Sequence, residues 1–250
     1  MLEVITNNLA NVNTSGYKRD ELSFSGMLNA LSASKFLAPP AYASVNAVNP
    51  GTVELDTVSA KFATDFAQGS IQRTDNPLDL ALDGSGFFVV QHANGIRYTR
   101  SGNFSLDSTG RLVTADGYPV MGINGLVQIQ GDRIEIDSTG QVIADGMPVA
   151  KLKLVDFQDT NGLIKAGNNT FMIADAAFSG RRVQGSQMAA EMPATAQVKQ
   201  GFLELSNVNA VYEMAKMIEA MRVYESYQKT IHLISESLEK ASDELGKISV

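Results

Sequence analysis

The chain contains no cysteine, which excludes disulfide bridges and metal sites built on thiolates. Only two histidines occur, His92 and His232. We expect them to lie far apart, one in a hairpin and one on a long helix, which argues against a dinuclear metal centre and a serine–histidine catalytic site. The sequence therefore predicts neither a metal nor a cofactor.

Long apolar runs and clusters of basic residues are also missing. Without an apolar run of membrane-spanning length, no membrane insertion is expected, and the N-terminus is too polar for a cleavable secretory signal peptide. The formal net charge is −7, and binding to nucleic acid needs clustered Lys and Arg, so no nucleic-acid partner is expected. Hydrophobic residues make up 44% of the chain, which is typical of a folded protein. A length of 250 residues suffices for one large or two modest domains.

Residues 206–250 predict a long helix with a coiled-coil seam. Apolar side chains recur at heptad spacing, and no Gly or Pro interrupts them before Gly246. The predicted seam consists of Ala210, Met217, Ala220, Tyr224, Tyr227, Ile231, Ile234, Leu238, Ala241 and Leu245. At 1.5 Å per residue this helix is roughly 60 Å long. Because one helix cannot bury its own seam, the pattern favours an assembly protein over an enzyme.

The N-terminal segment, residues 1–19, carries a second apolar stripe. Its members are Leu2, Ile5, Leu9 and Val12, which have the three-and-four spacing of a helix face. The residues between them are mostly Asn and Thr, which are mediocre helix formers, so this helix needs packing to be stable. The pattern leaves open whether it docks on its own subunit or joins an intersubunit bundle.

The middle of the chain predicts antiparallel β structure. Asn94-Gly95 is a hairpin signal, and residues 106–120 align with 136–149, with nine of fourteen aligned positions identical. Each copy contains Asp-Ser-Thr-Gly, which invites comparison with aspartic proteases. That chemistry needs two carboxylates about 3 Å apart, and one extra residue separates Asp from Gly in both copies. We therefore interpret Asp107 and Asp137 as turn residues.

These patterns together predict a mixed, mainly β fold, with a discontinuous antiparallel β domain inserted between N- and C-terminal coiled-coil helices. The expected parts are an N-terminal segment (1–19) whose helix Ser15-Gly16 stops, an extended linker (20–70), the β domain with the duplicated hairpin (71–190), a return linker (191–205) and the C-terminal coiled-coil helix (206–250).

Four runs resemble the flagellar rod and hook family of axial proteins, and they occur in the order expected for it. They are Val4 to Arg19, Asn76 to Phe88, Tyr98 to Phe104 and Gln200 to Val211. Within the first and last runs, the resemblance singles out Asn7, Asn8, Leu9, Ala10, Asn11, Gly16, Ser206, Asn207, Val208 and Asn209 as the family motif.

The resemblance implies a structural subunit of the bacterial flagellar basal-body rod. Its partners would be itself, other rod subunits and the flagellar type III export apparatus, which exports the chain without a cleavable signal peptide. Terminal helices would polymerise into a periplasmic, torque-transmitting tube. The length and the tail Met221 to Lys229 favour the proximal-rod type over the distal-rod type. The family also implies a further helical stretch before the Asn-rich motif.

A hypothesis of another class is an enzyme or adhesin that works through its β domain, with the helices as a stalk. It requires a pocket with convergent ionisable groups in the β region. The sequence offers no motif for one.

Overall fold

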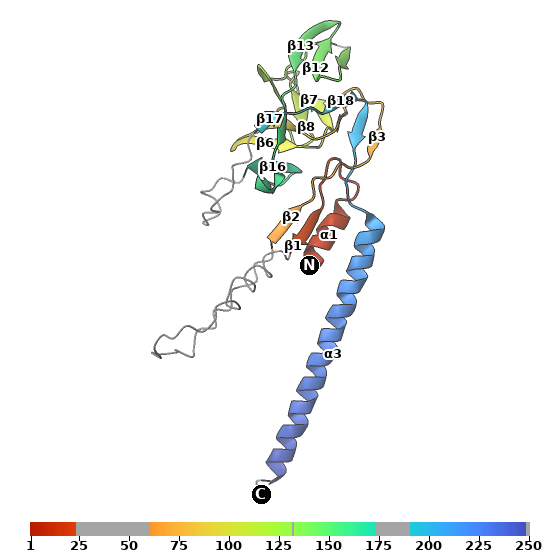
Figure 1. The fold of residues 1–250 in the computed structure, drawn as a ribbon, viewed down its shortest axis with the longest axis vertical. Helices are drawn as coiled ribbons and strands as arrows, with labels where there is room; N and C mark the ends of the chain where they lie inside the picture. The colour runs from red at the N-terminus through yellow and green to blue at the C-terminus, as the bar shows by residue number, and fades with distance from the viewer. Residues whose placement is uncertain (24–60, 132, 174–190, 249–250) are drawn as a thin grey trace, which may run out of the picture.

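The computed structural model describes residues 1–23, 61–131, 133–173 and 191–248. A short helix, α1 (Leu2–Ala10), begins the chain, and a helix of 39 residues, α3 (Ala210–Ile248), ends it. Short strands fill most of the described chain between them, so the protein is mainly β with a helix at each end (Figure 1). This coarse part of the predicted fold class is confirmed.

The strands are short and pair antiparallel wherever they form ladders. Their bounds are β1 Asp20–Ser23, β2 Lys61–Thr64, β3 Ile71–Arg73, β4 Leu80–Asp83, β5 Phe87–His92, β6 Gly95–Thr99, β7 Phe104–Leu106, β8 Leu112–Thr114, β9 Met121–Gly122, β10 Gly125–Leu126, β11 Ile134–Ile136, β12 Gln141–Ala144, β13 Met147–Lys151, β14 Leu154–Phe157, β15 Leu163–Lys165, β16 Thr170–Ile173, β17 Glu191–Pro193, β18 Gln197–Gln200 and β19 Phe202–Glu204.

Strand β5 lies at the centre of the packing. It belongs to a six-stranded sheet with the order β15-β16-β6-β5-β14-β17. Phe88 and Val90 join one buried cluster, while Phe87 and Val89 join another, because successive side chains of a strand point to opposite faces. Both faces of β5 are therefore covered, which explains why residues 87–90 form a continuous apolar run.

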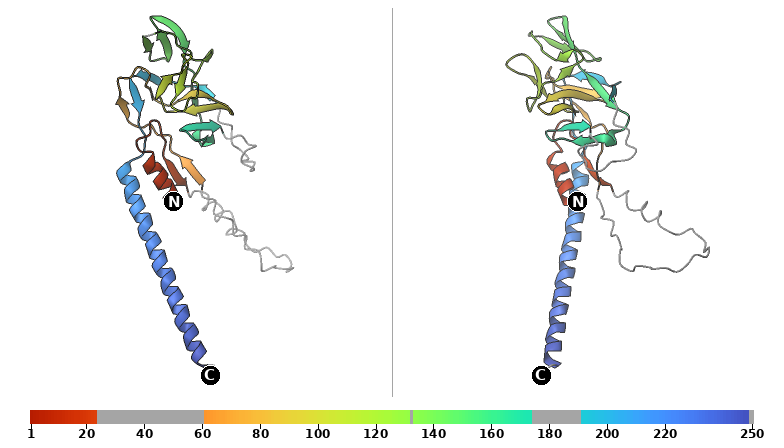
Figure 2. Two further views of the ribbon diagram at one scale, coloured as in Figure 1. Left: turned by 180° about the vertical axis from the view of Figure 1, so that it is seen from behind. Right: turned by 90° about the vertical axis from the view of Figure 1, so that its left-hand side faces the viewer.

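The long helix projects away from the strands. Figure 2 shows that α3 leaves the β region at its N-terminal end and extends beyond every other described element, while α1 lies beside its first turns. The hairpin of β12 and β13 lies at the opposite end of the molecule (Figure 1).

The two sequence repeats form hairpins with the same turn. In the first, Asp107 Oδ1 accepts hydrogen bonds from the amides of Thr109 and Arg111 at 2.8 and 3.0 Å and from Thr109 Oγ1 at 2.7 Å. In the second, Asp137 Oδ1 accepts the corresponding bonds at 2.8, 2.9 and 2.7 Å. The turn interpretation is confirmed. These hydrogen bonds favour the charged carboxylates and lower the pKa of both Asp107 and Asp137.

Replacing both aspartates by asparagine should flatten the acid sensitivity of the fold. A carboxyl group with a lowered pKa stabilises the fold above its unfolded pKa of about 3.9, and this contribution is lost as the pH falls through the folded value. The double variant Asp107→Asn/Asp137→Asn should melt lower at neutral pH and lose less stability on acidification. Thermal unfolding from neutral to strongly acidic pH measures this. The control is Asp116→Asn, at an exposed turn residue. The prediction is contradicted if the double variant loses as much melting temperature on acidification as the unaltered protein does.

The structure differs from the sequence prediction at three places. The N-terminal helix ends at Ala10, so Val12, predicted on its apolar face, lies in the turn that follows it. Residues 191–205, predicted as a return linker, include β17, β18 and β19, which pair with β14, β4 and β3. The C-terminal helix begins at Ala210 and not at Ser206, since Asn209 caps it by accepting the Tyr212 amide at 3.1 Å. Most of the predicted linker 20–70 and residues 174–190 of the predicted β domain lie outside the described residues.

Candidate functional site

The predicted seam on α3 is largely uncovered in the single chain. Tyr224, Tyr227, Ile231, Ile234 and Leu238 are each between 55% and 66% exposed. The members nearest the N-terminal end of α3, Ala210, Met217 and Ala220, are half-buried. Ala241 and Leu245 lie on α3, and their side chains fall outside the described part of the structure. A row of large exposed apolar side chains on one helix is typical of a protein–protein contact surface.

The N-terminal stripe packs on the same chain. Ile5 is buried, Leu9 and Val12 are half-buried, and Leu2 is partly exposed. Helix α1 lies against the first turns of α3, as both views of Figure 2 show. Below α1, a groove of about 660 Å³ opens between Leu2 and the α3 residues Ala220, Tyr224 and Tyr227. Within the described chain, α1 thus covers only the part of the seam near the N-terminal end of α3.

The Asn-rich motif fastens α1 to the strand that follows it. Asn8 is buried, and its side chain donates to Asp20 O at 2.9 Å and accepts from Asp20 N at 3.0 Å. The Tyr17 hydroxyl donates to Asn7 Oδ1 at 2.7 Å. Asn11 donates to the Asn7 carbonyl at 2.9 Å, while Ala10, also in the motif, is exposed. Of these side chains, Asn8 pairs the backbone N–H and the carbonyl of Asp20 and so joins α1 to β1.

The C-terminal motif joins the two ends of the chain. Asn207 accepts a hydrogen bond from Arg19 N at 2.8 Å and donates to the carbonyls of Asp65 and Ala67 at 2.8 and 3.1 Å. Ser206 Oγ accepts from the Val208 amide at 3.2 Å, and the Val208 side chain is buried. The motif residues therefore hold the start of α3 against the N-terminal segment.

At the centre of this junction lies a buried charge cluster that the sequence analysis does not predict. Lys18 Nζ lies 2.6 Å from Glu204 Oε1, and Arg100 Nη1 lies 3.2 Å from Glu204 Oε2. Lys18 and Glu204 have no exposed side-chain surface, and Arg100 is almost fully buried. Lys18 also donates to Ala67 O at 2.7 Å, and Arg100 to Gly84 O at 2.8 Å. A signal did exist: each of the four runs quoted for the family resemblance contributes one group to this cluster.

The cluster holds two cations and one anion. Burial lowers the pKa of Lys18 and of Arg100, because a charged group loses hydration in the interior, and Glu204 opposes both shifts. The carboxylate of Glu204 also accepts from the Gly69 amide at 3.0 Å. Glu204 is therefore the group on which the electrostatic balance of the junction depends.

Gly16 brings the N-terminal motif against the β region. It has φ +66°, and a Cβ there would lie 2.4 Å from the carbonyl carbon of Arg100. Its amide donates to the Glu204 carbonyl at 2.8 Å. Only glycine combines this backbone conformation with so close an approach.

Gly16→Ala should therefore destabilise the protein more than an alanine at a comparable open position. The left-handed conformation alone costs a non-glycine residue about 1–3 kcal/mol, and at Gly16 the clash with Arg100 adds to this. Gly117 also has positive φ, +83°, but a Cβ there meets nothing within 4 Å, so Gly117→Ala is the matched control. Urea unfolding of both variants measures the difference. Equal losses of stability would contradict the predicted contact.

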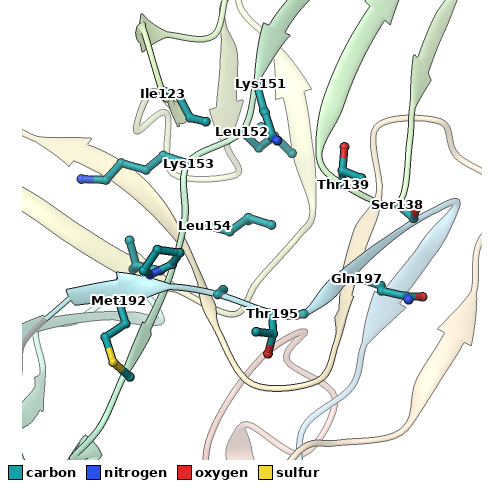
Figure 3. Close-up of a pocket in the computed structure, with 14 residues that line it drawn as sticks. Ile123, Ser138, Thr139, Lys151, Leu152, Lys153, Leu154, Met192, Thr195 and Gln197 are labelled. Carbon is teal, nitrogen blue, oxygen red and sulfur yellow. The ribbon is translucent and has the colours of Figure 1, made fainter.

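A separate cavity in the β region offers little for catalysis. It has a volume of about 630 Å³ and lies among the β11–β12 turn, β13, β14, β17 and β18. Figure 3 shows Lys151 beside Thr139, Thr195 on the opposite side, and Lys153 pointing away from both threonines. The described residues that line it include neither a carboxylate nor a histidine. Across the described parts of the chain, no group of His, Asp and Glu is arranged to hold a metal ion.

His92 lies in the β5–β6 hairpin, as predicted, where its Nδ1 accepts the Asn94 amide at 3.0 Å. His232 lies on α3. Among the helices that the structure describes, none combines the length and apolarity needed to cross a membrane.

Three family models match the chain. The model described as the flagellar hook protein FlgE/F/G D1 domain matches residues 81–144. The C-terminal model of the flagellar basal body rod FlgEFG proteins matches residues 199–244, and the flagella basal body rod protein model matches residues 1–18. The last two matches coincide with the segments that meet at the Glu204 cluster.

Relatives of the same family match over nearly their whole length. The flagellar basal-body rod protein FlgG of Bacillus subtilis strain 168 is 36% identical over 96% of this chain and 91% of its own. FlgF of Caulobacter vibrioides is 33% identical over 99% of this chain and 93% of its own, and the hook-basal body complex protein FlhO of B. subtilis is 31% identical over 98% and 93%. These similarities do not separate the FlgF type from the FlgG type. The chain belongs to the flagellar rod and hook family of axial proteins.

Proposed function

We propose that this chain is a structural subunit of the flagellar basal-body rod and that it polymerises through its terminal helices. The observation that carries the proposal is the exposed apolar seam on α3, from Tyr224 to Leu238. A seam of this kind is stable only when other helices cover it. Relatives along the whole chain that are named as rod proteins support the same function.

The mode of assembly follows from where the seam lies. Helix α3 extends beyond α1 and the β region, so neighbouring subunits can reach its lower half from several sides (Figure 1). Identical subunits that meet through different surfaces form open helical assemblies, as a tube requires. The helices would form an inner coiled-coil layer and the β domain, residues 71–190, an outer wall that helps to transmit torque.

The partners in this proposal are further copies of the chain, other rod subunits and the flagellar type III export apparatus. The location is the periplasm-spanning rod of the basal body. A catalytic role is not part of the proposal. The cavity of about 630 Å³ in the β region offers lysines and hydroxyls, without an acid–base pair among its described lining residues.

Purified hook–basal bodies test the proposal. Mass spectrometry should find this chain in particles that contain the other rod proteins, and its absence from them would refute the rod assignment. Its copy number relative to those proteins distinguishes the two rod types. A low number supports the proximal-rod type, which the sequence favours, and a high number supports the distal-rod type.

A further inference from the structure

One carboxylate connects parts of the chain that are far apart in sequence. Glu204 binds Lys18 in the N-terminal segment, the Gly69 amide, and Arg100 in the β region. Its backbone carbonyl accepts hydrogen bonds from the Gly16 amide at 2.8 Å and from Ser15 Oγ at 3.2 Å. The surface on which the N-terminal segment docks is therefore built in part by the C-terminal segment.

The charges make the two docking events unequal. When only the C-terminal segment is docked, Glu204 and Arg100 form a neutral pair. When only the N-terminal segment is docked, Lys18 is buried beside Arg100 without the carboxylate that pairs with both, and only the weaker attraction of Asp65 for Lys18 and of Asp156 for Arg100 remains. Burying like charges without a counter-ion is strongly unfavourable, so the second arrangement is disfavoured.

Backbone pairing points in the same direction. The C-terminal segment is anchored to the β region through the pairing of β19 with β3, and it directly follows β18, which pairs with β4; neither pairing involves the N-terminus. In the part of the chain that the structure describes, residues 1–19 form no strand ladder with the β region; side chains of that region hold them, with Lys165 donating to Lys18 O at 2.7 Å and Asn169 donating to Ser15 O at 2.5 Å. They also use Asn207 of the C-terminal segment, whose side chain accepts from Arg19 N at 2.8 Å and whose backbone N–H donates to Tyr17 O at 3.4 Å. A nine-residue helix such as α1 is not stable alone, so it depends on this support.

We infer that the Glu204 cluster makes docking of the two chain ends ordered: residues 202–209 dock first, and residues 1–19 dock only on the completed C-terminal segment. Glu204 is the group that permits the second step, because it neutralises the cation that the N-terminal segment brings. The subunit thus has three states, with both ends free, with the C-terminal segment docked, and with both docked. The fourth combination is suppressed.

Hydrogen exchange on the full-length chain, read by mass spectrometry, tests this order. Lys18→Met removes the ammonium group and leaves the Glu204–Arg100 pair. Exchange should rise in residues 1–19, while the amides of β19 stay protected relative to the unfolded chain. Glu204→Gln removes the anion with little change of shape. It should release residues 1–19 as well as β19, and the amides of β5 should stay protected in both variants.

Arg19→Met is the matched control. Arg19 is the next residue along, and its ion pairs with Glu21 and Asp65 lie at the partly exposed surface. This variant should leave the protection of both ends close to that of the unaltered chain. The inference is overturned if residues 1–19 stay protected in Glu204→Gln, or if Lys18→Met releases β19 as completely as it releases residues 1–19. Loss of protection in β5 would mean that the variant has unfolded globally. If Glu204→Gln does so, hydrogen exchange of Lys18→Met in urea below its unfolding midpoint decides which end opens first.

Discussion

An aspartate at Ile231 or at Leu238 is expected to abolish assembly while leaving the β region folded. Both side chains are about two-thirds exposed in the single chain, at 64% and 66%. Substitutions at such sites usually change the stability of the monomer by less than about 0.5 kcal/mol. In an assembled rod the same positions would be buried, and an unpaired carboxylate there costs several kcal/mol at every contact.

The measurement combines motility with the recovery of the variant in hook–basal bodies, and circular dichroism reports the fold of the isolated chain. Ser237→Asp is the matched control, since it adds the same charge next to Leu238 but about 100° around the helix. We expect this control to assemble. Normal rods built from the Ile231→Asp and Leu238→Asp variants would refute the assignment of these residues to an interface.

Glu204→Gln is expected to cost the isolated protein about 3–5 kcal/mol, because it removes the carboxylate that pairs with both buried cations. Lys18→Met should cost less, since the Glu204–Arg100 pair at 3.2 Å survives it. In the Glu204→Gln background, Lys18→Met should become neutral or stabilising, because it then removes an unpaired buried charge. The two substitutions are therefore expected to be strongly non-additive.

Urea unfolding of the two single variants and the double variant, followed by circular dichroism, gives these energies. The cycle separates a charge effect from a simple loss of packing. If the cost of Lys18→Met is the same in both backgrounds, the ion pair at 2.6 Å contributes nothing specific to stability. Arg100→Met in the same cycle tests whether the second cation is equivalent to the first.

Features that depend on neighbouring residues were predictable from the sequence. The Asp107 and Asp137 turns follow from side chains that bind amides two and four residues away. The hairpin at Asn94-Gly95 follows from the backbone preferences of two adjacent residues. The long helix follows from heptad periodicity, a signal that repeats along one segment.

Features that depend on distant partners were not predictable. Strands β18 and β19 are short, and they are strands because they pair with β4 and β3, which lie more than a hundred residues earlier in the chain. The charge cluster joins residues separated by as many as 186 positions. Lys18 and Glu204 lie in two of the runs that carry the family resemblance, but nothing within either run pairs one residue with the other, and only the folded chain reveals that they are buried together.

The attachment of α3 has a mechanical consequence. Thirty-nine helical residues extend for roughly 58 Å, whereas the contacts that connect the start of this helix to the strands occupy a few residues around Glu204 and Asn207. A sideways load at the far end acts on that small area with the leverage of the whole helix. We expect the bending stiffness of the isolated subunit to depend on this joint and on the packing of α1 against the first turns of α3, so a substitution that loosens the joint should soften the subunit without shortening or kinking its arm.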